Sequence, residues 1–140
     1  MKTILTCLDT SPRAPHVLST AADLARRTGA RLVLFRSVGL PPELAREDII
    51  GVSPNALADR LVEAAKADLE RFRADVPPEL MAGIEVRVGT PWNAICAEAT
   101  ARSVDLIVIG SHGYGGIDRL LGTTAAKVVN HADRSVLVVR

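Results

Sequence analysis

The sequence predicts an α/β protein built on one open, doubly wound parallel sheet. Strand-like apolar runs alternate with helical patterns along the chain, several of those runs are continuously apolar, and no repeat or linker separates them. Continuously apolar strands are typical of a sheet that is covered by helices on both faces. We therefore expect a single domain over residues 1–140, with five strands in the order 3-2-1-4-5.

The first half of the chain alternates two strands with two helices. The first strand, over 4–8, ends at Asp9-Thr-Ser-Pro12, a turn sequence that also starts a helix. Apolar residues then recur at helical spacing over 17–25, and Gly29 is a typical C-cap for that helix. The rest of this half is a second strand over 31–38, a proline-containing loop over 40–54 and a long helix over 55–75.

The second half continues the same alternation to the end of the chain. Apolar and charged residues alternate over 84–88, which suits a strand near the edge of the sheet. Pro91 stands where the next helix begins, a position at which its missing N–H is not needed. The other expected elements are strands over 104–109 and 135–139 and helices over 91–101 and 123–131.

The bulk composition narrows the classes of function. A net charge of +1 and an aromatic content of 3% argue against a nucleic-acid binder or a protein of acidic membrane surfaces. No apolar run approaches the roughly 20 residues that a membrane span needs, so a cytoplasmic location is expected. Cys7 and Cys96 share no metal-like spacing with the histidines, which favours two buried thiols over a disulfide or a metal site.

The most informative stretch follows the fourth strand. Gly110-Ser-His-Gly113 leads through further glycines to Gly122-Thr-Thr, where the last helix begins. Glycine lets the backbone approach a ligand closely, and a helix start offers unpaired N–H groups and partial positive charge. In the expected strand order, Asp9 and Gly110 meet at the switch point of the sheet. Together these features predict a crevice that binds a phosphate, and hence a nucleotide.

Each of these residues also has a purely structural explanation. Asp9 could serve only to cap the first helix, the glycines only the turn, and Thr123 or Thr124 only the last helix. Neither the P-loop motif nor the dinucleotide fingerprint is present, and no group of base, nucleophile and metal ligands is visible. We therefore expect no catalytic residue and no protein metal ligand, and a site that holds a nucleotide better than it cleaves one.

Three segments of the chain carry a resemblance to a known family. They are Ile4-Leu5 with Asp9 and Ser11, Asp105 to Gly113, and Ser135 to Val139. Through them the chain resembles the universal stress protein family over essentially its whole length. The resemblance implies the doubly wound fold, a cytoplasmic stress-response role and a homodimer paired through Ser135–Val139. A last strand that is apolar on both faces and lies at an uncovered edge favours such pairing.

The family contains ATP binders and proteins that bind no nucleotide, and the binders carry spaced glycines followed by Ser or Thr. The resemblance implies ATP, with Mg²⁺ bridging its phosphates, and with little or slow hydrolysis. The implied contacts are Cys7, Asp9 and Ser37 for adenine, Gly110 for ribose, and Gly113, Gly122, Thr123 and Thr124 for the phosphates.

One feature of the chain departs from the binding pattern of the family. The eight residues 114–121 make the loop before Gly122 one residue shorter than in that pattern. Loop length has only a modest entropic effect, so a tightened loop can still serve ATP. The shortening is nevertheless the feature that favours the alternative, a dimeric interaction module that binds no nucleotide. A true ATPase or a nucleotidyl transferase of related fold is a third hypothesis.

Overall fold

The computed structural model describes residues 1–39, 54–111 and 121–140. These residues form one parallel sheet in the order β3-β2-β1-β4-β5, as the sequence predicted. The strands are β1 (Thr3–Cys7), β2 (Arg31–Val38), β3 (Met81–Val88), β4 (Leu106–Gly110) and β5 (Ser135–Val139). The helices are α1 (Ala14–Thr28), α2 (Pro54–Ala74), the short 3₁₀ helix η2 (Pro78–Leu80), α3 (Pro91–Ala101) and α4 (Thr123–His131).

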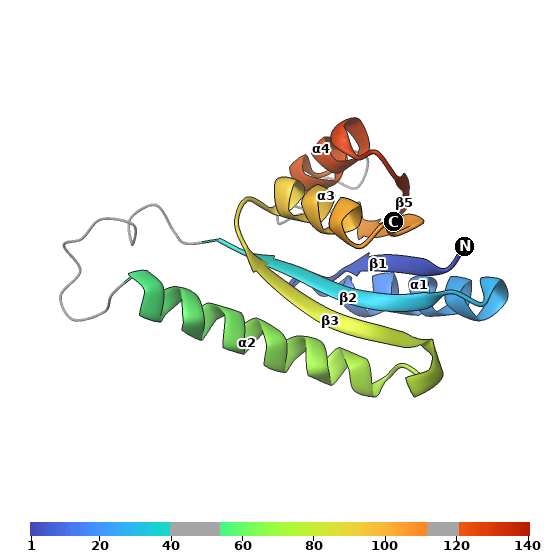
Figure 1. Ribbon diagram of the computed structural model, residues 1–140, viewed down its shortest axis with the longest axis horizontal. Coiled ribbons are helices and arrows are strands. Elements are labelled where there is room, and N and C mark those ends of the chain that lie inside the picture. The colour runs from blue at the N-terminus through green and yellow to red at the C-terminus, as the bar shows by residue number, and fades with distance from the viewer. Residues whose placement is uncertain (40–53, 112–120) are drawn as a thin grey trace.

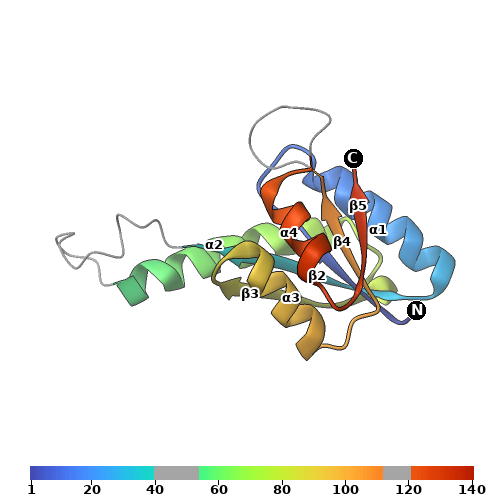
Figure 2. The ribbon, with the colours of Figure 1, turned by 90° about the horizontal axis from the view of Figure 1, so that it is seen from above.

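The sheet is buried between two helical layers. Helices α1 and α2 cover one face, and α3 and α4 cover the other (Figures 1 and 2). Successive strand residues point to opposite faces, so in β1 Ile4 packs in the core beneath α1 while Leu5 packs beneath α3. Both side chains are fully buried. This two-sided burial is the reason that the strands are apolar without alternation.

Several local predictions are confirmed, and the starts of two strands are wrong, since β4 begins at Leu106 and not at Val104. Gly29 ends α1 in the left-handed conformation, with φ 74°, and its N–H donates to the carbonyl of Ala25. Pro91 is the first residue of α3. Strand β3, however, begins at Met81 and not at Ile84, because it pairs with β2 before its apolar alternation begins. The register shift between Leu32 and Val33 accompanies this early pairing.

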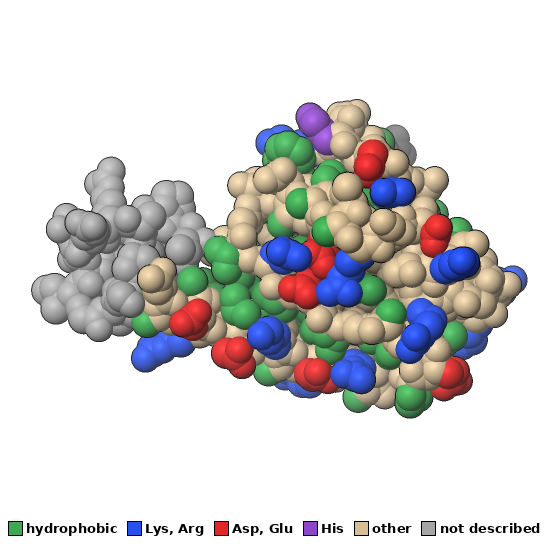
Figure 3. Space-filling view, in the orientation of Figure 1, with side chains coloured by type: hydrophobic (Ala, Val, Ile, Leu, Met, Phe, Trp, Pro, Cys, Tyr) green, Lys and Arg blue, Asp and Glu red, His purple; other side chains and the backbone are tan. Residues whose placement is uncertain are grey.

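The outer face of α2 carries charges of both signs, as its sequence indicates. Figure 3 shows side chains of both charge signs along this helix. Ion pairs one turn apart join Lys66 to Glu63 and Arg73 to Glu70, both at 3.6 Å. Such exposed pairs contribute little stability, so α2 is held chiefly by its buried residues, among them Ala65 and Leu69. Within the described residues, no helix is both long and apolar enough to span a membrane.

Because all the strands are parallel, their carboxyl ends lie at one edge of the sheet. Strand β1 lies at the centre, between β2 and β4, where the direction of winding reverses. Cys7, the last residue of β1, is paired with Phe35 on one side and with Ile109 on the other. This is the switch point at which open α/β sheets bind their ligands.

Candidate functional site

A cavity of about 370 Å³ lies at this switch point. Its inner part is apolar, because Cys7, Phe35 and Ile109 form one row across three neighbouring strands. Its size falls in the usual range for small-molecule pockets. The other lining residues are Leu8, Asp9, Thr10, Ser11, Arg13, Val17, Arg36, Ser37, Pro91, Ile95, Gly110, Gly122, Thr124 and Ala125.

The turn after β1 places a carboxylate at the rim of the cavity. Asp9 Oδ1 accepts a hydrogen bond of 2.9 Å from the backbone N–H of Ser11. The N-cap of α1 is Arg13, and no side chain caps that helix. Asp9 therefore shapes the turn that precedes α1, and does not cap the helix as the structural alternative required. Its side chain is exposed and lines the cavity.

Ser37 is fixed at the end of β2 by the turn that leads into α3. Its Oγ donates a hydrogen bond of 3.2 Å to the carbonyl oxygen of Gly89. The N–H of Gly89 in turn donates to the carbonyl of Val38. Gly89 has φ 153°, which an L-amino acid rarely adopts, so glycine is needed in this turn. The hydroxyl of Ser37 therefore already uses its one hydrogen as a donor within the protein, and it can only accept hydrogen bonds from a ligand.

Two backbone hydrogen bonds of Ser111 join the residue after β4 to the end of β5 and to the start of α4. The N–H of Ser111 donates to Val139 at 2.8 Å, and the carbonyl of Ser111 accepts from the N–H of Gly122 at 2.7 Å. Gly122 is the N-cap of α4 and has no side chain with which to cap the helix. The N–H groups of the first turn, from Thr123 to Ala125, therefore have no acceptor within the helix. A helix start of this kind attracts anions.

The cysteine in the cavity is an apolar wall and not a nucleophile. Burial, with a smaller contribution from Cys96, raises the pKa of the Cys7 thiol far above its ordinary value. Cys96 is half-buried, not fully buried as expected, and burial followed by the nearby Asp133 carboxylate raises its pKa as well. Both thiols are free. In the described part of the chain, no three His, Cys, Asp or Glu side chains are grouped so that they could hold a metal ion.

The structure brings most of the predicted site residues into this one cavity. Those that line it are Cys7, Asp9, Ser37, Gly110, Gly122 and Thr124. Thr123 begins α4 but is exposed and is not among the lining residues. Gly113 and His112 lie outside the described residues.

Two features of the cavity were not predicted from the sequence, namely its apolar floor and the buried arginine beside it. Phe35 and Ile109 were assigned to strands, but their alignment with Cys7 depends on strand register, which a single sequence does not reveal. Arg36 interrupts an apolar strand. That interruption was the available signal, because a charged residue inside a buried strand needs a partner.

Comparisons with known proteins agree with this arrangement. The model of the universal stress protein family matches residues 1–140. A universal stress protein of Thermus aquaticus is 34% identical over 141 aligned residues, which cover 99% of this chain and 98% of that protein. The solved structure of MJ0577 from Methanocaldococcus jannaschii superimposes with a TM-score of 0.83 at 26% identity, covering 99% of this chain and 94% of that one.

A further structure shares the fold at lower identity. It is the universal stress protein of Archaeoglobus fulgidus in complex with dAMP, with a TM-score of 0.68 and 22% identity, covering 100% of this chain and 98% of that one. At this identity the likeness concerns the fold alone. The match of the family model to the whole length, together with the Thermus relative, shows that this chain belongs to the universal stress protein family, a family of stress-response proteins.

Proposed function

We propose that this protein binds ATP in the cavity at the switch point and acts as a cytoplasmic stress-response regulator with little hydrolysis. One observation carries the proposal: a single cavity runs from the apolar row at Cys7, Phe35 and Ile109 to the open start of α4 at Thr124. A base needs a flat apolar surface, and phosphates need N–H donors. The two ends of the cavity offer these two kinds of surface.

The polar groups at the rim suggest how the nucleotide would be oriented. Asp9 and Ser37 would accept hydrogen bonds from adenine, since both offer oxygen lone pairs. Gly110 would lie against the ribose. The phosphates would accept hydrogen bonds from the N–H groups of the first turn of α4, at Thr123 and Thr124. Gly122, whose own N–H donates to Ser111, and the predicted loop glycine Gly113 would let the backbone approach the phosphates closely. Mg²⁺, when bound, would neutralise phosphate charge and be held by ATP oxygens and water.

One further observation supports nucleotide binding, and another argues against cleavage. The Archaeoglobus protein that was solved with dAMP shares this fold, so the fold is compatible with an adenine nucleotide. Among the described lining residues, Cys7 is held as a neutral thiol and Asp9 already accepts a hydrogen bond from its own turn. Neither is arranged as a nucleophile with its base.

The test is the affinity for ATP of the unmodified protein and of Gly122→Val, measured by isothermal titration calorimetry. Gly122 has φ −59° and ψ 155°, which any residue adopts, so the variant is expected to fold. Crowding at the start of α4 should weaken binding roughly tenfold or more, about 1.4 kcal/mol. Asn130→Val, a β-branched substitution near the other end of α4, is the matched control and should bind normally.

The outcome that contradicts the proposal is equally clear. If the unmodified protein shows neither a heat of binding nor a melting shift at millimolar ATP, the protein is not a nucleotide binder. The interaction module that binds no nucleotide would then be the better description.

We also propose that two copies pair through β5. In the described residues β5 bonds only to β4, so its outer edge is open. Leu137 is exposed on this strand, and Val129 of α4 is a second exposed apolar side chain. Leu137→Lys should shift the protein toward monomer in sedimentation velocity, whereas Val88→Lys, on the opposite edge strand, should not. Equal mass for all three proteins would exclude pairing through β5.

A further inference from the structure

Arg36 is the buried cation beside the candidate nucleotide site. It lies near the end of β2, its side chain is 8% exposed, and all three guanidinium nitrogens are engaged. Nε donates to the carbonyl of Leu8 at 2.8 Å, and Nη2 donates to the carbonyl of Asp9 at 3.0 Å. Nη1 pairs with Oδ2 of Asp68, on α2, at 2.6 Å. One side chain therefore joins β2, the turn after β1 and α2.

The two carbonyls belong to the part of the backbone that shapes the cavity. Strand β1 ends at Cys7, and although the N–H of Leu8 still donates to the carbonyl of Phe35, the carbonyls of Leu8 and Asp9 lie beyond the strand. A buried carbonyl without a partner costs free energy, and Arg36 supplies a charged donor to each. The fork of the guanidinium fixes both oxygens at once, which a lysine ammonium cannot match. The position of the Asp9 carboxylate at the rim thus depends on Arg36.

Asp68 holds the far side of the same guanidinium. Its other oxygen, Oδ1, pairs with Nη2 of Arg71 at 2.5 Å, so the carboxylate bridges two arginines. The hydrogen bond from Arg36 is the main cause that lowers the pKa of Asp68. Asp68 is therefore an anion at neutral pH, and it fixes the end of Arg36 that points away from Leu8 and Asp9.

Arg36 lies between two hollows of the protein. Asp9, Arg36 and Ser37 line the candidate nucleotide cavity, and they also line a second, more open hollow of about 710 Å³ on the side of α2. Asp68 and Phe72 line only the second hollow. A change in α2 at Asp68 would reach the nucleotide cavity through Arg36, with no rearrangement of the sheet.

We propose that Arg36 is a positioning residue for nucleotide binding, and that its pair with Asp68 couples α2 to the site. The inference rests on the proposed nucleotide function and adds to it a route of regulation. A partner that displaced α2 at Asp68 would therefore weaken nucleotide binding. Because coupling between two sites is reciprocal, bound nucleotide would weaken the binding of that partner by the same factor.

The experiment is a double-mutant cycle on the ATP dissociation constant, with unfolding in urea measured in parallel. Arg36→Met should weaken ATP binding about tenfold, within the usual range of coupling energies, and Asp68→Ala by a smaller factor. Asp68→Ala should have no further effect on affinity in the Arg36→Met background. Arg36→Lys should recover only part of the loss. Arg31→Met is the matched control, because Arg31 also donates from β2 to a backbone carbonyl, that of Met81, but at the other end of the strand.

The possible results distinguish the proposed nucleotide function from the positioning role of Arg36. If the unmodified protein binds no ATP, the nucleotide function fails, and this inference fails with it. If the unmodified protein binds ATP and Arg36→Met binds it equally well, the nucleotide function survives and the positioning role is overturned, even when the variant is less stable. Additive losses from Arg36→Met and Asp68→Ala would overturn the coupling. If Arg36→Met does not fold, Asp68→Ala and Arg36→Lys decide the question on the same criteria.

Discussion

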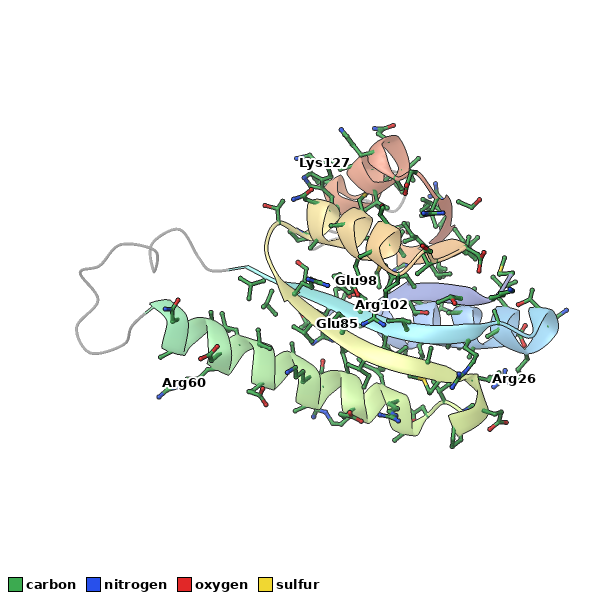
Figure 4. All side chains as sticks on the ribbon, viewed as in Figure 1. Arg26, Arg60, Glu85, Glu98, Arg102 and Lys127 are labelled. Carbon is green, nitrogen blue, oxygen red and sulfur yellow. The ribbon has the colours of Figure 1, made fainter. Side chains whose placement is uncertain are left out.

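The carboxylate of Glu98, on α3, accepts a hydrogen bond of 2.5 Å from Nε of Arg87, on β3. The side chain of Glu98 is only 1% exposed, whereas that of Arg87 is 51% exposed. Arg102 pairs with the other oxygen of Glu98 and also with Glu85, at 2.8 Å. These three side chains are labelled in Figure 4, where they lie close together. A buried anion between two arginines thus joins α3 to the edge strand, away from the candidate nucleotide cavity.

Glu98→Gln should therefore destabilise the protein without changing its affinity for ATP. The substitution leaves two guanidinium groups without their buried anion, which we expect to cost about 2 kcal/mol, below the full cost for a buried pair because both arginines reach water. Unfolding in urea measures this cost. Glu79→Gln, on the exposed η2 helix, is the matched control and should have almost no effect. A stability equal to that of the unmodified protein would show that the ion pairs of Glu98 make no net contribution to folding.

Much of the fold could be predicted because its signals are local. Apolar runs, the C-cap at Gly29 and the helix start at Pro91 each act within a few residues, and the alternation of elements then permits few strand orders. The network around Glu98 could not be predicted in this way. Glu98 stands between Ala97 and Ala99, and its partners Arg87 and Arg102 flank α3 on either side in sequence, so its burial between them appears only after α3 has packed onto the sheet.

The candidate site was predictable to the same degree. Its glycines and Asp9 follow the ends of strands, and turn residues that follow an apolar run are a local signal in the sequence. Arg36 was missed because its three partners are Leu8, Asp9 and Asp68, which are distant in sequence and meet only after the sheet has formed. The place of the helix start at Gly122 in the cavity was predicted, but the row that Cys7 forms with Phe35 and Ile109 depends on the strand register.

Thr6→Val should stabilise the protein. Thr6 is fully buried in β1, between Leu34 and Val108, and its Oγ1 makes no hydrogen bond within the described residues. Replacing an unsatisfied buried hydroxyl with a methyl group of the same shape removes its desolvation penalty, which predicts a gain of about 1 kcal/mol. The free energy of unfolding in urea is the measurement.

A threonine with partners provides the control for that substitution. Thr100 Oγ1 bonds to the carbonyl of Cys96 and to Asp133, so Thr100→Val should be neutral or slightly destabilising. A loss of stability in Thr6→Val would mean that the hydroxyl of Thr6 has a partner after all.

Gly110→Ala should be destabilising because of one side chain on α1. A Cβ built on Gly110 would lie 3.3 Å from Cγ2 of Val17, closer than such atoms normally approach, and both residues are part of the packed cavity wall. We expect a loss of roughly 1 kcal/mol from this overpacking. In Gly110→Ala/Val17→Ala the clash is removed, so the two losses should combine to less than their sum. Strict additivity would place the added methyl group somewhere other than against Val17.

The acid limb of the stability curve, which is the decline in the free energy of unfolding as the pH falls, should depend on Asp68. Its pKa in the folded protein is lowered below the ordinary 3.8, first by the hydrogen bond from Arg36. The unfolded chain therefore takes up the proton more readily, so Asp68 contributes stability above about pH 4 that is lost as the pH falls through the lower folded pKa. Asp68→Asn should have a shallower decline in unfolding free energy below about pH 4 than the unmodified protein.

Asp105 offers an independent comparison for the same measurement. Backbone N–H groups of Lys2 and then Thr3 lower its pKa. Asp105 directly precedes β4, at the amino ends of the strands, whereas Arg36 lies near the carboxyl end of β2. Asp105→Asn should therefore also flatten the acid limb, but Arg36→Met should flatten it only through Asp68. The double variant Arg36→Met/Asp68→Asn tests this dependence. If Arg36 is the main cause of the lowered pKa of Asp68, the double variant should flatten the decline in unfolding free energy by less than the sum of the two separate effects. An additive effect would show that Arg36 is not that cause.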